Sequence, residues 1–138
     1  MKAESMVAGE AADQRLRDSL AHALLQDALP AELEGFGEED TRAAAEFIAA
    51  SASRRSPGTA LVRLESSGTQ LGRRRMRTCM ANDDMPFLVD SVASAIAARG
   101  LIIHRLLHPV VCVSRDKDGR LKALEPLCED MSRRESIM

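Results

Sequence analysis

The chain has 138 residues, of which 45% are hydrophobic and only 2% are aromatic. This length leaves room for one domain with a helical appendage. The formal net charge of −2 is the difference between 19 basic and 21 acidic residues, which argues against a dedicated nucleic-acid binder. The sequence shows neither the apolar stretch of a signal peptide nor one long enough to cross a bilayer. We therefore predict a cytoplasmic protein with no nucleic-acid and no membrane partner.

The three cysteines, Cys79, Cys112 and Cys128, are odd in number and widely spaced. This usage fits neither a disulfide framework nor the ligand spacing of a zinc site. We expect all three to be reduced thiols that pack as small hydrophobic side chains.

Residues 1–56 are predicted to form a helical amino-terminal region. Apolar residues recur at three- and four-residue spacing from Leu16 to Ala28, which predicts an amphipathic helix that begins after Gly9 and stops at Pro30.

A second helix is predicted from Asp40, as its N-cap, to about Ser53. The Ser-Pro-Gly sequence that follows would break this helix. A domain boundary is therefore expected near Pro57.

Residues 57–138 show the changing periodicity of an α+β domain. The predicted elements are a strand at 61–64 ended by a turn at 66–68, a strand at 73–80, a polar turn at 82–84, a helix at 86–99, and a strand at 101–113 interrupted by Pro109. Pro86 suits the first turn of that helix, and Gly100 suits its end. The Asp118-Gly119 pair predicts a hairpin turn at 116–119, from which residues 120–124 return antiparallel.

Several motifs follow one another in a fixed order along the chain, an order that chance rarely supplies. They are Arg55-Ser56-Pro57-Gly58, the long block Asn82-Asp83-Asp84-Met85-Pro86-Phe87-Leu88-Val89-Asp90-Ser91-Val92, then His104, His108-Pro109-Val110-Val111, Arg115-Asp116, Asp118-Gly119 and Glu135-Ser136. Together they resemble the first ACT-like domain near the start of the large NAD-specific glutamate dehydrogenases of bacteria. The first half of the chain resembles that family only in its helical character.

The resemblance implies an α+β fold, in which a helical region precedes an incomplete ACT-like module with an antiparallel sheet of the ferredoxin-like βαββαβ kind. Because the family pattern continues past Met138, residues 57–138 are expected to be a partial ACT-like domain, truncated at its C-terminus. An unfinished sheet has free edges, which favour association with the remainder of the dehydrogenase or with another copy of the chain.

The resemblance also implies a function. Enzymes of this family convert glutamate to 2-oxoglutarate with NAD in glutamate catabolism, and their catalytic domain lies far downstream. The chain is therefore predicted to be an inactive regulatory or assembly fragment, without catalytic, cofactor-binding or metal-binding residues, and NAD is expected only in the catalytic domain. A free-standing ACT-like module that senses an amino acid or docks onto a protein is the alternative.

One candidate ligand site lies at the turn before the predicted helix. In ACT domains an Asp-x-Pro-Gly turn lets a small amino-acid effector approach backbone N–H groups. Asp84-Met85-Pro86 matches this turn, although Phe87 replaces the glycine. Two interpretations remain open: acidic residues that stabilise a helix start, or an effector site formed by Asp83, Asp84, Met85 and His104.

Two other groups of polar residues have a structural and a functional interpretation. His104 and His108 would share one face of a strand, but no third metal ligand occurs at a recognisable spacing, so a structural role is preferred. The arginines at positions 73, 74, 75 and 77 form the only basic cluster. A solvated strand edge that discourages strand addition is preferred to a phosphate contact.

Overall fold

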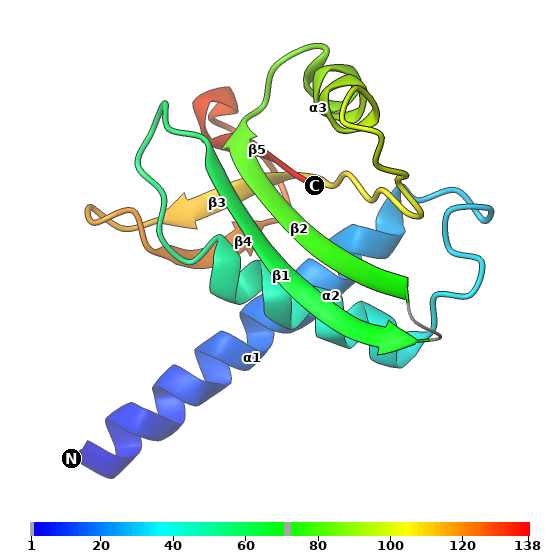
Figure 1. The fold of residues 1–138 in the computed structure, drawn as a ribbon. Helices are drawn as coiled ribbons and strands as arrows, with labels where there is room; N and C mark the ends of the chain where they lie inside the picture. The colour runs from blue at the N-terminus through cyan, green and yellow to red at the C-terminus, as the bar shows by residue number, and fades with distance from the viewer. Residues whose placement is uncertain (1, 71–72) are drawn as a thin grey trace.

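The computed structural model describes residues 2–70 and 73–138, and the side chains of residues 3–66 and 75–138. Within these ranges, two helices cover one face of a five-stranded antiparallel sheet, and a third helix lies at one end of it (Figure 1). The predicted α+β fold class is confirmed. None of the described helices combines the length and the apolar character that a bilayer crossing requires.

The first helix, α1 (Lys2–Gln26), begins earlier and ends earlier than predicted. It runs through Gly9, because one glycine costs only about 1 kcal/mol and the neighbouring Ala and Glu residues favour helix. Only the second half of α1 packs, through the buried side chains of Leu16, Leu20 and Leu24. The first half is exposed and projects from the body of the protein (Figure 1).

The second helix, α2 (Glu38–Ser51), begins before the predicted N-cap at Asp40. Gly37 is the N-cap instead, and its backbone N–H donates a hydrogen bond to Oδ2 of Asp40 at 2.9 Å. Asp40 therefore stabilises the helix from inside its first turn, by accepting from the N-cap N–H as the third helical residue of a capping box does. The helix packs beside α1 and buries Ala45 and Ile48.

The sheet has the strand order β1-β2-β5-β3-β4, and every neighbouring pair is antiparallel. Its strands are β1 (Leu61–Gln70), β2 (Arg73–Asp83), β3 (Val110–Arg115), β4 (Leu121–Glu125) and β5 (Arg134–Ile137). The last strand along the chain, β5, thus lies in the middle of the sheet. The first strand and β4 form the two edges.

Two of the predicted turns are wrong, because the residues belong to strands. The chain stays extended through residues 66–68, where β1 remains paired with β2 across an irregularity in register; residues 71–72 lie outside the described part. In the turn predicted at 82–84, Asn82 and Asp83 instead extend β2, since β5 pairs with them. In both places a partner strand overrides the local turn preference.

The third helix, α3 (Leu88–Ala97), starts after the predicted position at Pro86. Phe87 is its N-cap and has a φ of 65°, which is uncommon for a residue with a side chain. Gly100 follows the helix with a φ of 73°, which confirms the predicted glycine end. No residue of α3 is fully buried.

The strand predicted at 101–113 forms only in its second part, as β3. Residues 101–109 are irregular, and Ile102 is 80% exposed. Their high strand propensity predicted a strand, but no neighbouring strand in the described part of the chain pairs with them. The break predicted at Pro109 is the point at which β3 begins.

The predicted hairpin is confirmed, because the turn at 116–119 joins β3 to an antiparallel β4. The Oδ1 atom of Asp116 accepts hydrogen bonds from the N–H groups of Asp118 and Arg120 at 2.9 and 3.0 Å. The hydrogen bond from the Arg120 N–H is the main reason that the pKa of the Asp116 carboxyl lies below its ordinary value. Gly119 takes a φ of 81° there, which a residue with a side chain adopts only at a cost.

One hydrophobic core joins the helices to the sheet. Its buried members come from both sides of Pro57, so the two helices pack on the sheet rather than apart from it. They are Leu16, Leu20, Leu24, Ala45, Ile48, Ala52, Cys79, Ala81, Val111, Val113, Leu121 and Ile137.

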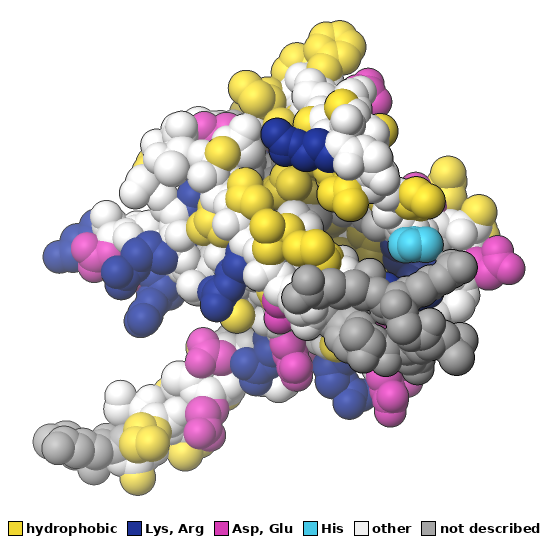
Figure 2. Space-filling model, viewed as in Figure 1, with side chains coloured by type: hydrophobic (Ala, Val, Ile, Leu, Met, Phe, Trp, Pro, Cys, Tyr) yellow, Lys and Arg dark blue, Asp and Glu magenta, His cyan; other side chains and the backbone are white. Residues whose placement is uncertain are grey.

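The other face of β1 and β2 is apolar, and no described helix covers it. Val62, Leu64 and Met76 lie on this side, because the strand register places them opposite to the buried Cys79 and Ala81. Each of the three is more than half exposed. Figure 2 shows hydrophobic side chains gathered on this side of the molecule, over the two strands and around α3. These three residues are termed the outer apolar face.

The prediction of three reduced thiols is wrong for two of them. The structure joins Cys112 of β3 to Cys128, in the connection between β4 and β5, by a disulfide with Cα atoms 5.5 Å apart. The spacing of cysteines in the sequence could not show this, since the path of the chain around β3 creates the pair. Cys79 is a free, buried thiol, and burial raises its pKa to about 11.

Candidate functional site

Four of the sequence motifs contribute to a cluster of charges near the middle of the sheet. Glu135, on β5, is 3% exposed, and its carboxylate accepts two hydrogen bonds from Nε and Nη2 of Arg115, both at 2.9 Å. The Nη1 atom of Arg55 lies 3.0 Å from the same carboxylate. Both arginine side chains are nearly buried as well. Because the carboxylate lies between two guanidinium groups, all three charges can be buried together.

The two arginines also donate to backbone carbonyl groups. Nη1 of Arg115 donates to the carbonyl oxygens of Ala52 and Gly119 at 2.9 and 2.8 Å. Nε of Arg55 donates to that of Thr59 at 2.7 Å. Arg115 therefore links the end of α2 and the hairpin turn to the carboxylate on β5.

The turn considered as an effector site or as an acidic helix start supplies two more carboxylates. Asp83 pairs with Nη2 of Arg55 at 2.8 Å. Asp84 pairs with Nη2 of Arg134 at 3.2 Å and accepts a hydrogen bond from the Ser136 hydroxyl at 3.0 Å. Neither carboxylate caps α3, whose N-terminus has no side-chain cap, so their partners are the arginines. The charge network is defined as Arg55, Asp83, Asp84, Arg115, Arg134 and Glu135.

Three of the four candidate effector residues lie together. Asp83, Asp84 and Met85 are consecutive at the end of β2, and Met85 is 51% exposed. His104 is exposed in the irregular segment after α3. No hydrogen bond or ion pair within the described part of the chain joins it to the other three residues. An effector that binds the two carboxylates would have to displace their arginine partners.

His108, rather than His104, lies near the turn. Burial lowers the pKa of His108, and the negative charge of Asp84 opposes this shift. Its Nε2 atom is buried and has no hydrogen-bond partner among the described residues. The four-residue spacing of the two histidines in the sequence did not show which of them lies near the turn. The packing of the segment before β3 partly buries His108 and leaves His104 exposed. No group of three His, Cys, Asp or Glu side chains suited to a metal ion occurs among the described residues.

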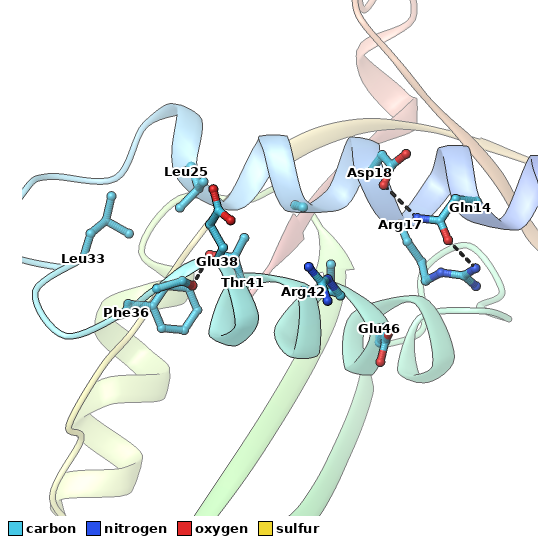
Figure 3. Close-up of a pocket in the computed structure, with 13 residues that line it drawn as sticks. Gln14, Arg17, Asp18, Leu25, Leu33, Phe36, Glu38, Thr41, Arg42 and Glu46 are labelled. Carbon is cyan, nitrogen blue, oxygen red and sulfur yellow. Dashed lines mark hydrogen bonds between the residues drawn. The ribbon is translucent and has the colours of Figure 1, made fainter.

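A separate cleft of about 560 Å³ lies between α1 and α2 (Figure 3). Leu25 and Phe36 line its apolar end. Along α1, Gln14 donates a hydrogen bond to Asp18 at 2.8 Å and accepts one from Arg17 at 2.9 Å. These polar groups therefore satisfy one another without a ligand. No residue of the charge network lines the cleft.

A comparison with protein families gives one match, to the family described as glutamate dehydrogenase, ACT1 domain. The match extends over residues 20–138, so it includes α2, all five strands and the whole charge network. The chain belongs to this family. No match was found among the curated proteins or among the solved structures. The family resemblance inferred from the motifs is confirmed at the level of the glutamate dehydrogenase ACT1 domain.

In this ACT1 domain four of the separate motifs contribute side chains to one charge network. From the sequence, Arg55, Arg115 and Glu135 were identified only as members of family motifs, and their contacts with one another were not predicted. A signal was nevertheless present, because Arg115 follows the apolar residues of β3 and Glu135 stands close to Ile137. A charged residue next to a buried strand is rarely buried unless it is paired. The partners themselves could not be identified without the fold.

The network has the composition of a structural element of the ACT1 domain. Three arginines face three carboxylates, and each carboxylate has an arginine within 3.2 Å. A general base or a nucleophile needs a group that is free to accept a proton or to attack. Since the carboxylates are engaged in ion pairs, the arrangement can hold strands and loops together.

Proposed function

We propose that the chain is a non-catalytic regulatory and assembly segment of an NAD-specific glutamate dehydrogenase of bacteria, which converts glutamate to 2-oxoglutarate in the cytoplasm. The observation that carries this proposal is the family match over residues 20–138. The charge network supports it, because its arginines and carboxylates neutralise one another. On this proposal, glutamate and NAD bind in the catalytic domain of the parent enzyme.

The purified chain is expected to form no NADH from glutamate and NAD, because on this proposal both bind in the catalytic domain of the parent enzyme, and the buried carboxylate of Glu135 is already paired with two arginines. NADH absorbance measured over several hours checks this, with the complete dehydrogenase from the same genome as the positive control. Glutamate-dependent turnover that follows the chain through every purification step would contradict the proposal.

The outer apolar face gives the assembly role a physical basis. Val62, Leu64 and Met76 are 58% to 59% exposed, and the neighbouring α3 has no buried residue. A contiguous apolar surface on a folded domain commonly marks a contact with another protein. We propose the remainder of the dehydrogenase as the partner, since the ACT1 family is defined as a domain of that enzyme.

Leu64→Lys is expected to weaken association with the separately expressed downstream part of the dehydrogenase by about tenfold or more, because it places a charge within an apolar contact. Gel filtration and titration calorimetry measure this association. Met6→Lys is the matched control, since Met6 is 67% exposed on the projecting half of α1. Equal affinities of the two variants, or a wild-type chain that does not associate, would count against docking through this face.

A further inference from the structure

The connection between β4 and β5 has to pass across β3. The two strands lie on opposite sides of β3 in the sheet, so residues 126–133 carry the chain from one side to the other. This segment, termed the crossover, includes a short 3-10 helix, η1 (Met131–Arg133). It buries little apolar surface, because Leu127 is 79% exposed and Met131 is 61% exposed.

Non-covalent contacts of the crossover are few and largely polar. Nε of Arg133 donates to the carbonyl oxygen of Val113 at 3.2 Å, and the same side chain pairs with Glu125. Asp130 accepts a hydrogen bond from the Ser132 N–H at 3.0 Å, which keeps η1 folded on itself. Such partly exposed pairs contribute little to stability. Neither these polar contacts nor the burial of apolar side chains therefore holds the crossover firmly on β3.

The disulfide supplies the missing attachment. Cys112 is 6% exposed on β3, between Glu125 of β4 and Arg134 of β5 in the strand register. Cys128 lies within the crossover and is partly exposed. The bond between them fixes the middle of the crossover to the strand that it passes.

We propose that the Cys112–Cys128 disulfide is a redox-sensitive clip that keeps β5 seated in the centre of the sheet. The strand β5 has only four residues, and three of them pair with each neighbouring strand, so its own ladder is short. It nevertheless carries Glu135, the carboxylate that both buried arginines share. Opening the clip frees the crossover, and the strand that positions this carboxylate then exchanges more readily with an unpaired state. The clip is independent of the proposed function, since it acts within this chain.

The chemistry is thiol–disulfide exchange with a low-molecular-weight thiol. Its thiolate attacks Sγ of Cys128, the more accessible sulfur, the S–S bond breaks, and Cys112 leaves as a thiolate that takes up a proton. A second thiolate attacks the mixed disulfide and releases Cys128, so two thiols are oxidised and the protein disulfide gains two electrons. The reverse reaction with a low-molecular-weight disulfide closes the clip. Cys79 does not compete, because it is 1% exposed and a raised pKa keeps its thiol protonated.

Thiol titration and hydrogen exchange test the clip on the whole chain. After treatment with oxidised glutathione, the denatured chain is expected to show one reactive thiol, and after dithiothreitol three. Reduction should raise the unfolding equilibrium constant about a hundredfold, as for other loops of this length. Amide exchange should become faster first in the crossover and β5. Three reactive thiols after oxidation, or unchanged exchange in β5 after reduction, would overturn the proposal.

Two variants separate the clip from a general effect of the reductant. Cys79→Ser is expected to keep the response to dithiothreitol, since it leaves both clip cysteines in place. Cys128→Ser is expected to lose the response and to exchange β5 amides at the rate of the reduced wild-type chain. If Cys128→Ser does not fold, the comparison of oxidised and reduced wild-type chains decides alone. A response that persists in Cys128→Ser would overturn the proposal.

Discussion

Replacing Glu135 with glutamine is expected to lower the free energy of unfolding by about 3–5 kcal/mol, the usual loss when one partner is removed from a buried ion pair. Glutamine keeps the size of the side chain but removes the charge that Arg55 and Arg115 share. Asp83, which is 47% exposed, would remain as the counter-charge of Arg55, whereas Arg115 would keep no carboxylate partner among the described residues. Denaturation by urea, followed by circular dichroism, measures the change. Because small domains are stable by only about 5–15 kcal/mol, the loss is a large fraction of the total.

Glu65→Gln is the matched control for this prediction. Glu65 makes the same kind of pair with Arg77, at 3.3 Å, but the two side chains are 44% and 37% exposed. Water screens such a pair, so the same chemical change there is expected to cost less than about 1 kcal/mol. Similar losses in the two variants would show that burial of the network does not determine its contribution to stability.

Features that depend on neighbours in the sequence could be predicted for this protein. The hairpin at 116–119 follows from an Asp-Gly pair between apolar runs, and the glycine end of α3 follows from Gly100. The α+β class follows from the change of periodicity after Pro57. Errors of a few residues arose at helix starts, where Gly37 rather than Asp40 is the N-cap.

Features that depend on distant segments could not be predicted in the same way. The place of β5 between β2 and β3 is decided by pairing with strands far away in the sequence, and it turns Asn82 and Asp83 from a predicted turn into a strand. The carboxylate of Asp83 was considered for an effector site or for the start of a helix, yet its arginine partner lies 28 residues away. The disulfide has the same origin, because the crossover alone brings Cys128 to Cys112. The motifs were sufficient to identify the family, but the ion pairs that their charged residues form could be seen only in the structure.

Gly119→Ala is expected to be the other severely destabilising substitution, with a loss of about 2–5 kcal/mol. The left-handed backbone of Gly119, with a φ of 81°, costs a residue with a side chain about 1–2 kcal/mol. An added Cβ would also lie 2.3 Å from the carbonyl oxygen of Arg55, and relief of such overpacking typically costs a further 1–3 kcal/mol, roughly. Relief requires movement of the Arg55 backbone, whose N–H donates to the Gly119 carbonyl at 3.0 Å.

Gly58→Ala separates the two contributions, and thermal or urea denaturation of both variants measures them. Gly58 has nearly the same backbone, with a φ of 75°, but nothing lies within 4 Å of a Cβ placed there. It should therefore lose only the conformational part, about 1–2 kcal/mol. The additional loss of stability in Gly119→Ala then measures how tightly the hairpin turn packs against the backbone of Arg55, in the segment after α2. Equal losses would mean that this contact is loose, and that the turn does not position Arg55 for its ion pairs with Glu135 and Asp83.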